Sequence, residues 1–389
     1  MKKLWTTVAI SLLAITLCVA CSKKDKSADV TEYRIGVAAP FTGQYGEYGD
    51  MVYNGAKLYV DKVNEAGGID GKPVVLVKGD ELCDPKEAAT IAQKFVADES
   101  IVAVLGHLCS SATLAAQAYY NKAGLVEFSP TSTAVNVGSG SIWTFRSVYR
   151  DDFQGAFLAQ YAKEALNLKS VAIFYENNDY GIGLKDAFTA EAKKQGLKIS
   201  ATESYTSQDT DYASQLAKIK KTKPGALFIA GLYNEGALIA SQARDLGIKA
   251  PIMGGDGIGS PGYIKNAGKA AEGTLITQPF LLDAAIGKAK DFGKDFHAKF
   301  DKDPDWMAAT SYDAAGILIE AIRESAGVRG GATRAGVRSN IARMNSRETG
   351  FSGVTGITYF DENGDCYKPI YVMTVKDGKF VAAKKQLLD

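Results

Sequence analysis

Two adjacent serines at a predicted strand-to-helix junction are the residues of this chain best suited to hold an anion. Ser110 and Ser111 lie in the octet 106–113, after an apolar, β-branched run at 101–105 that predicts a buried strand and before good helix formers at 115–123. We expect the serines at the N-cap of this helix. Free backbone N–H groups converge at such a helix start and attract carboxylates. A capped helix that binds nothing is the alternative.

Length and composition exclude several classes of protein. The 389 residues suffice for about two domains, and a net charge of +1 gives no strong field toward nucleic acid or an acidic membrane surface. No internal apolar run approaches the roughly 18 residues of a membrane span. The two histidines and the three cysteines beyond the N-terminal segment, Cys83, Cys109 and Cys366, are scattered without metal-ligand spacing. We therefore expect no metal and no cofactor.

The N-terminus has the pattern of an export signal. Lys2 and Lys3 precede an apolar stretch at 4–17, which predicts a signal peptide over 1–20. Small residues before Cys21 and a polar stretch after it resemble the lipobox of bacterial lipoproteins. The resemblance implies a lipidated Cys21, a linker over 21–31 and a location in the periplasm or at the cell exterior. Cys18 stands where a lipobox usually has Leu, and plain secretion is the alternative.

Strands and helices then alternate at short spacing, which predicts an α/β fold of doubly wound parallel sheets. The alternation restarts near 145–151, so two lobes are expected. The tail has helices at about 285–300 and 311–326 and two strands joined at Asn363 and Gly364, and it must pack onto both lobes. Strands are predicted at 33–40, 74–79, 101–105, 125–129, 170–175, 198–205, 226–230 and 251–254.

The cysteines that remain after export fit an oxidising compartment. Cys83 and Cys109 each follow a predicted strand, and these strands should be neighbours in a parallel sheet. A Cys83–Cys109 disulfide is therefore plausible. Cys366 would be left as a buried thiol.

Ligands of open α/β sheets bind at the carboxyl ends of the strands. Here those positions are rich in tyrosines and hydroxyls, with one acid for a cation and one helix start for an anion, which is chemistry suited to a small zwitterion. The residues are Tyr48, Leu108, Cys109, Ser110, Thr131, Thr133, Tyr180, Tyr233 and Asp256.

These motifs, in this order, resemble the periplasmic leucine/isoleucine/valine-binding proteins, which are substrate-binding subunits of branched-chain amino-acid ABC transporters. The most specific segments are 66–71, 83–86, 106–113, 178–181 and 254–257. The resemblance implies a type I periplasmic binding protein fold, with two Rossmann-like lobes joined by three crossovers that close on the ligand. We place lobe 1 at 32–147 plus 280–354 and lobe 2 at 148–279 plus 355–389.

The resemblance also implies roles for individual residues. Cys83–Cys109 is the disulfide of the family. Ser110 and Thr133 contact the α-carboxylate end, Thr131 offers a carbonyl to the α-ammonium, and Asp256 stands where relatives carry Glu. Tyr180 closes over the ligand. The side chain of the ligand is enclosed by Tyr48, Leu108, Cys109, Tyr233 and either Trp306 or Met307.

The function implied is capture of a small, neutral aliphatic amino acid by a monomer that delivers it to an ABC permease. Alternatives are another small ligand, such as an amide or aromatic acid, or sensory input to a membrane receptor. An enzyme is not expected, because no G-x-S-x-G motif or activated nucleophile is present. His107 near Ser110 is more simply a structural residue.

Overall fold

The computed structural model describes residues 30–327 and 331–387. The predicted signal peptide, Cys21 and nearly all of the predicted linker lie outside this part of the chain. Within it, no helix is both long enough and apolar enough to cross a membrane.

The first sheet is formed by the N-terminal part of the described chain. Its five strands run parallel in the order β2-β1-β3-β4-β5, and α1 (Gly46–Glu65), α2 (Pro85–Ala97) and α3 (Ser110–Ala123) connect them. All five residues of β3 are buried, as expected for a strand covered by helices on both faces. The strands are β1 (Tyr33–Ala39), β2 (Val74–Asp80), β3 (Ile101–Leu105), β4 (Val126–Ser129) and β5 (Thr144–Arg146).

The second sheet has seven strands in the order β14-β13-β10-β9-β8-β6-β7, and its first five in chain order, β6 to β10, are parallel. β13 and β14 come from the tail and pair antiparallel at one edge. The strands are β6 (Ser170–Glu176), β7 (Lys198–Tyr205), β8 (Leu227–Ala230), β9 (Ile252–Gly254), β10 (Leu275–Gln278), β13 (Tyr371–Lys376) and β14 (Lys379–Ala382). The helices are α4 (Asp151–Gln160), α5 (Asp179–Lys194), α6 (Ala213–Lys221), α7 (Tyr233–Asp245) and α8 (Pro261–Ala267).

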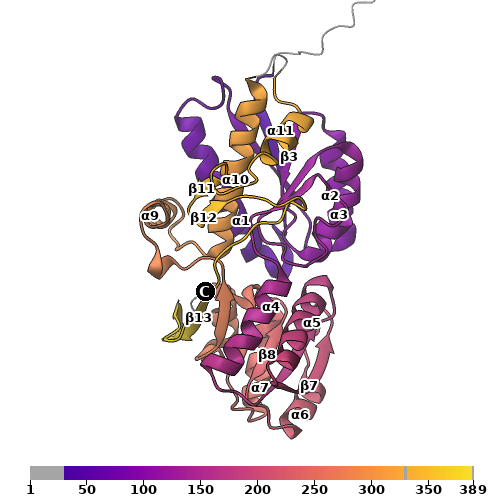
Figure 1. Cartoon of the computed structure of the whole chain (residues 1–389), viewed down its shortest axis with the longest axis vertical. Helices are drawn as coiled ribbons and strands as arrows, with labels where there is room; N and C mark the ends of the chain where they lie inside the picture. The colour runs from indigo at the N-terminus through magenta and orange to yellow at the C-terminus, as the bar shows by residue number, and fades with distance from the viewer. Residues whose placement is uncertain (1–29, 328–330, 388–389) are drawn as a thin grey trace, which may run out of the picture. The chain divides into compact units, whose positions relative to one another are not determined.

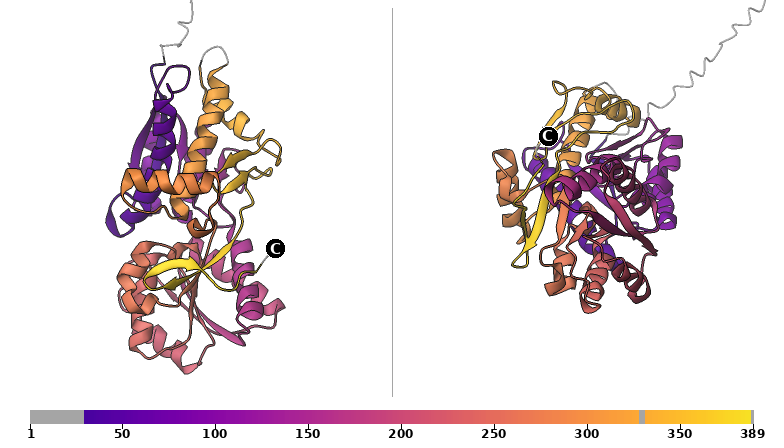
Figure 2. Two further views of the ribbon diagram at one scale, coloured as in Figure 1. Left: turned by 90° about the vertical axis from the view of Figure 1, so that its left-hand side faces the viewer. Right: turned by 60° about the horizontal axis from the view of Figure 1, so that its bottom comes forward.

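The C-terminal third returns to the first sheet before it joins the second. Helix α10 (Trp306–Ala326) lies beside α1 and β3, α11 (Arg334–Ile341) packs on α10 and β3, and α9 (Lys288–Phe300) also packs on α1 (Figures 1 and 2). The Ser311 hydroxyl donates to the carbonyl of Val52 at 2.6 Å, which ties α10 to α1. The chain thus passes between the two sheets after β5, after β10 and before β13, as the type I fold requires.

Two expected elements differ from the structure. Asn363 and Gly364 do not join two strands, because only an isolated bridge between Phe360 and Cys366 flanks them. The Asp361 side chain holds this turn by accepting from the N–H of Asn363 at 2.8 Å. The hairpins lie instead at β11 (Phe351–Gly353) with β12 (Gly356–Thr358), and at β13 with β14. Helix α10 also begins earlier than expected, since Asp305 caps it by accepting from Ala308 N–H at 2.9 Å.

A buried arginine fixes the place where the chain leaves the first sheet. Arg146 is 1% exposed, and its Nε donates to Asp365 at 2.6 Å. Its other nitrogens donate to the backbone carbonyls of Ser132, Ala134 and Val137. Full hydrogen bonding is what makes a buried ion pair tolerable. The thiol of Cys366, next in the chain, is free and buried.

Candidate functional site

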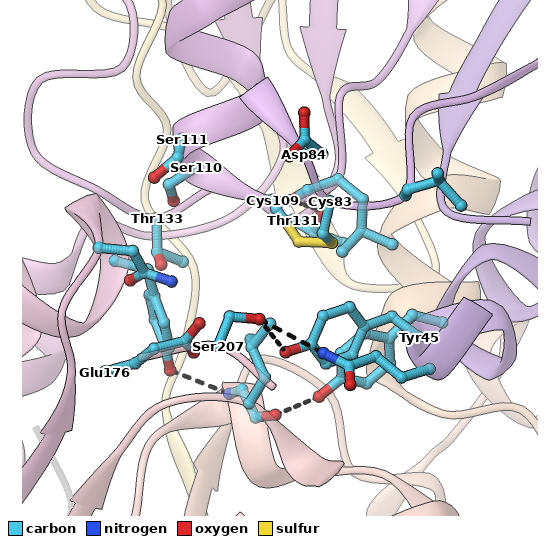
Figure 3. A pocket seen from close by; sticks show the side chains of 18 of the residues that line it. Tyr45, Cys83, Asp84, Cys109, Ser110, Ser111, Thr131, Thr133, Glu176 and Ser207 are labelled. Atoms are coloured by element: carbon cyan, nitrogen blue, oxygen red, sulfur yellow. Dashed lines mark hydrogen bonds between the residues drawn. A yellow bond between two sulfur atoms is a disulfide. The ribbon is translucent and has the colours of Figure 1, made fainter. Parts of the chain in front are cut away.

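A cavity of about 370 Å³ lies between the carboxyl edges of the two sheets (Figure 3). This volume is near the lower end of the roughly 300–1,000 Å³ of small-molecule sites. Eight of the nine ligand-binding residues predicted from the sequence line it, and so do both Trp306 and Met307. The eight are Tyr48, Leu108, Cys109, Ser110, Thr131, Thr133, Tyr180 and Asp256.

The octet forms the strand-to-helix turn that the sequence predicts, but the prediction of its capping residue is wrong. Helix α3 begins at Ser110 with Cys109 as N-cap, and no side chain caps it. Cys109, which is joined by a disulfide to Cys83, has the extended backbone of an N-cap residue, so both serines fall inside the first turn. The hydroxyl of Ser110 instead accepts from Ala134 N–H at 3.2 Å. The first N–H groups of α3 have no partner within the helix, which leaves them available to an anion.

A buried network beneath the octet fixes its backbone. His107 is fully buried, with Nδ1 against the Glu81 carboxylate and Nε2 2.9 Å from the Tyr120 hydroxyl. Glu81 also accepts from Leu108 N–H at 3.2 Å. Both ring nitrogens are therefore engaged away from Ser110, and the arrangement is that of a structural histidine rather than a base that activates the serine.

The second sheet contributes a carboxylate from the opposite side. Asp256 follows β9 and is 2% exposed; its Oδ1 accepts from the Tyr180 hydroxyl at 2.9 Å, while Oδ2 is buried with no hydrogen-bond partner. Burial raises the pKa of Asp256 to about 7. Asp151, at the start of α4, is a second buried carboxyl in this region, and burial followed by the charge of Asp256 raises its pKa well above the ordinary value. Sequence reasoning missed Asp151, since the residue belongs to no motif.

Tyrosines form one wall of the cavity. Tyr48 is fully buried, donates to the carbonyl of Gly257 across the cleft and accepts from Tyr233 N–H at 3.2 Å. Tyr233 does not line the cavity, unlike the other predicted residues. Its ring lies edge-on behind Tyr48, with centroids 4.7 Å apart, and its hydroxyl donates to the Gln44 carbonyl at 2.7 Å. Tyr233 therefore supports Tyr48 rather than facing the cavity.

Several polar lining residues were not predicted. They lie at the end of β6, just after β6 and β7, or before α1, where the strand-end rule selected only Tyr180 after β6 and no residue after β7. They are Gln44, Glu176, Asn178, Ser207 and Gln208.

Hydrogen bonds across the cleft hold the two lobes closed. Ser111 donates to Asp179 at 2.6 Å, joining α3 to α5. Gln44 donates to Glu235 at 3.0 Å on the other side of the cavity. Cavity-lining groups such as Asp256 are buried in this closed arrangement.

The described residues hold one cluster of possible metal ligands, Glu81 with Cys83 and Cys109. Both sulfurs are joined in the disulfide, so neither is a free thiolate.

Comparison with known proteins agrees with this geometry. The model of a family described as periplasmic binding protein matches residues 32–379. The chain belongs to this family. The periplasmic binding protein described here is 32% identical over 347 residues to the Leu/Ile/Val-binding protein homolog 1 of Brucella suis biovar 1, covering 87% of this chain and 89% of that one. It is 30% identical to the leucine-, isoleucine-, valine-, threonine- and alanine-binding protein of Pseudomonas aeruginosa, covering 85% and 86%.

Solved structures show the same fold. The substrate-binding protein LivJ of a branched-chain amino-acid transporter from Streptococcus pneumoniae, in complex with isoleucine, superposes with a TM-score of 0.84 at 33% identity. The superposed region covers 90% of this periplasmic binding protein and 98% of LivJ. The leucine-binding protein LivK from Thermotoga maritima gives a TM-score of 0.84 at 32% identity, with 90% and 97% covered.

Proposed function

We propose that this protein captures a neutral aliphatic amino acid, most readily a branched-chain one, and delivers it to an ABC permease. The observation that carries the proposal is the pairing of an open helix start at Ser110 with the unpartnered carboxylate oxygen of Asp256 across one closed cavity. A zwitterion leaves water only where both of its charges find partners. The names of the relatives support the same ligand class.

In the proposed complex the α-carboxylate lies at the start of α3, against Ser110 and Thr133. The α-ammonium lies against Asp256 and the carbonyl of Thr131, and Tyr180 holds Asp256 in place. The partners come from both lobes, so only the closed form satisfies both charges. Ligand binding therefore shifts the population toward closure.

The apolar wall accounts for preference among side chains. Leu108, Trp306, Met307 and the ring of Tyr48 are all at most 5% exposed and line the cavity. Each Å² of apolar ligand surface that they cover contributes roughly 25 cal/mol. Acidic side chains of a ligand have no basic partner among the lining residues.

We also propose the lobe boundaries and the cellular setting. The division at 147 and 280 follows the crossovers after β5 and β10. The last crossover lies later than 354, since the ring of Phe360 still packs on Phe128 and Phe145 of the first sheet.

We propose that Cys21 carries a lipid, that the protein works as a monomer outside the cytoplasm, and that a permease recognises the closed lobes.

Isothermal titration calorimetry with the twenty amino acids tests the ligand class. We expect leucine, isoleucine or valine to bind with a dissociation constant of about 1 μM or lower, equivalent to about −8.2 kcal/mol. Benzoate, an aromatic acid without an ammonium group, should not bind because Asp256 would keep a buried, unpaired oxygen. Failure of all twenty amino acids to bind would contradict the proposal.

The raised pKa of Asp256 predicts that acid favours closure of the empty protein. In the open form the carboxyl meets water and keeps a pKa near 4, whereas in the empty closed form its pKa is about 7. Closure therefore takes up a proton between these values, and the closed population should rise as pH falls from 8 to 5. Glu176, whose pKa burial raises to about 8, acts in the same direction.

Fluorescence energy transfer between dyes placed on the two lobes measures this effect without ligand. We expect the transfer efficiency to increase as the pH falls. The double variant Asp256→Asn, Glu176→Gln is the control and should lose most of the pH response. An unchanged response in that variant would assign the effect to other groups.

A further inference from the structure

Glu176 is a buried carboxyl in the cavity that the binding of a plain aliphatic amino acid does not use. It ends β6, is 3% exposed and lines the cavity. Its Oε2 has no hydrogen-bond partner. In Figure 3 the Glu176 side chain lies with Ser207 on the second-lobe side, facing Ser110, Ser111 and Thr133. An unpartnered buried oxygen costs free energy unless a ligand group reaches it.

The surroundings of Glu176 favour a donor of hydrogen bonds. The Glu235 carboxylate lies close enough to raise the pKa of Glu176 further, after burial, to about 8. Glu235 is itself occupied, accepting from Gln44 at 3.0 Å, from Tyr45 at 2.9 Å and from Gln208 N–H at 3.0 Å. The lining residues include three acids, Asp84, Glu176 and Asp256, and no lysine, arginine or histidine. A ligand group that carries positive charge or donates an N–H is therefore favoured beside these acids.

The sheet order gives the approximate spacing of the backbone positions that carry the two acids of the cavity. Asp256 follows β9 and Glu176 ends β6, and β8 lies between these strands. Neighbouring strands are about 4.8 Å apart, so the two positions are about 10 Å apart along the sheet edge. A ligand that bridges them needs two N–H groups separated by less than this, because each hydrogen bond adds about 2.9 Å.

Long amino-acid side chains that end in nitrogen have this reach. Six single bonds of about 1.5 Å join the two nitrogens of lysine, and five join those of glutamine. The hydroxyl of threonine sits next to the α-carbon and falls short. An aliphatic side chain such as that of leucine fills the space without reaching Glu176 with a donor.

We propose that Glu176 forms a second polar subsite that receives the terminal N–H group of a long amino-acid side chain, an amide or an ammonium. This inference rests on the proposed function, because it uses Asp256 and Ser110 to hold the backbone of the amino acid. It extends the ligand class from aliphatic amino acids to those of the glutamine or lysine type.

Calorimetry with leucine, norleucine, glutamine and lysine tests the subsite on the mature protein and three variants. We expect glutamine or lysine to bind with a dissociation constant below about 100 μM. Glu176→Leu should weaken that ligand at least tenfold while changing leucine less than threefold. Glu176→Gln should weaken lysine but retain glutamine, which distinguishes the two nitrogen groups. Norleucine, which has the length of lysine without its nitrogen, should not respond to either change.

The control variant is Glu203→Gln, which removes a carboxylate from the adjacent strand β7, where it pairs with Lys218 outside the cavity. It should leave every affinity within twofold. The inference is overturned if leucine binds but glutamine and lysine do not, or if Glu176→Leu and Glu176→Gln affect them no more than they affect leucine. Absence of binding by leucine as well would instead overturn the proposed function on which the subsite depends.

Discussion

Replacement of Asp256 by alanine is expected to weaken leucine binding at least thirtyfold. The substitution leaves the ligand ammonium without its carboxylate in a closed cavity, and removing one partner of a buried charge pair costs about 2 kcal/mol or more. The buried Oδ2 of Asp256 has no hydrogen-bond partner among the described residues, so it is free to accept from the ammonium of the proposed ligand. Calorimetry with leucine at pH 7.5 measures the change.

Two further variants separate charge from structure. Asp256→Asn keeps an acceptor for the Tyr180 hydroxyl, which now donates to Oδ1 at 2.9 Å, yet it removes the charge. It should lose nearly as much affinity as the alanine variant. Asp186→Asn removes an exposed carboxylate from α5 and should change affinity less than twofold. Leucine binding within threefold of the native value in Asp256→Ala would show that the ammonium lies elsewhere.

The sequence predicts inner strands such as β3 and β8 well because they are buried on both faces. Such strands appear as short apolar runs, as at β3, and need no knowledge of distant residues. The tail is harder. Asn363 and Gly364 have the local signal of a hairpin, but Phe360 packs on Phe128 and Phe145 instead of continuing a strand. That competing contact joins residues more than 200 positions apart and has no local signature.

The candidate site shows the same division between local and long-range information. The rule that ligands bind at the carboxyl ends of strands predicted Ser110 and Asp256. Chain direction alone places each residue at the carboxyl edge of its own sheet. The capping role assigned to the serines fails, since α3 already begins at Ser110 and Cys109 is its N-cap. Asp151 and Glu176 were missed because an acid in a sequence looks exposed by default. Only their packing between two lobes shows that they are buried.

Loss of the Cys83–Cys109 disulfide is expected to lower the free energy of unfolding by about 3.5 kcal/mol, the loop-entropy value for a separation of 26 residues. Equilibrium urea unfolding of Cys83→Ser, Cys109→Ser against the native protein measures it. Dithiothreitol should reproduce the loss in the native protein and have no effect on the double variant.

Cys366→Ser is the control: that thiol makes one weak contact, 3.7 Å from the Val148 carbonyl, and closes no loop. Its effect should be below about 1 kcal/mol.

The same disulfide should also affect ligand affinity, because it holds the start of α3. Leu82 and Cys83 both have positive φ, 54° and 55°, a conformation that costs non-glycine residues of order 1 kcal/mol each. Without the covalent bond this loop can relax, and Cys109 and Ser110 lose their fixed position beside the cavity. We therefore expect leucine to bind about tenfold more weakly to the double variant at temperatures where it is fully folded. Unchanged affinity together with reduced stability would mean that the buried contacts of His107 with Glu81 and Tyr120 suffice to hold the turn at the start of α3.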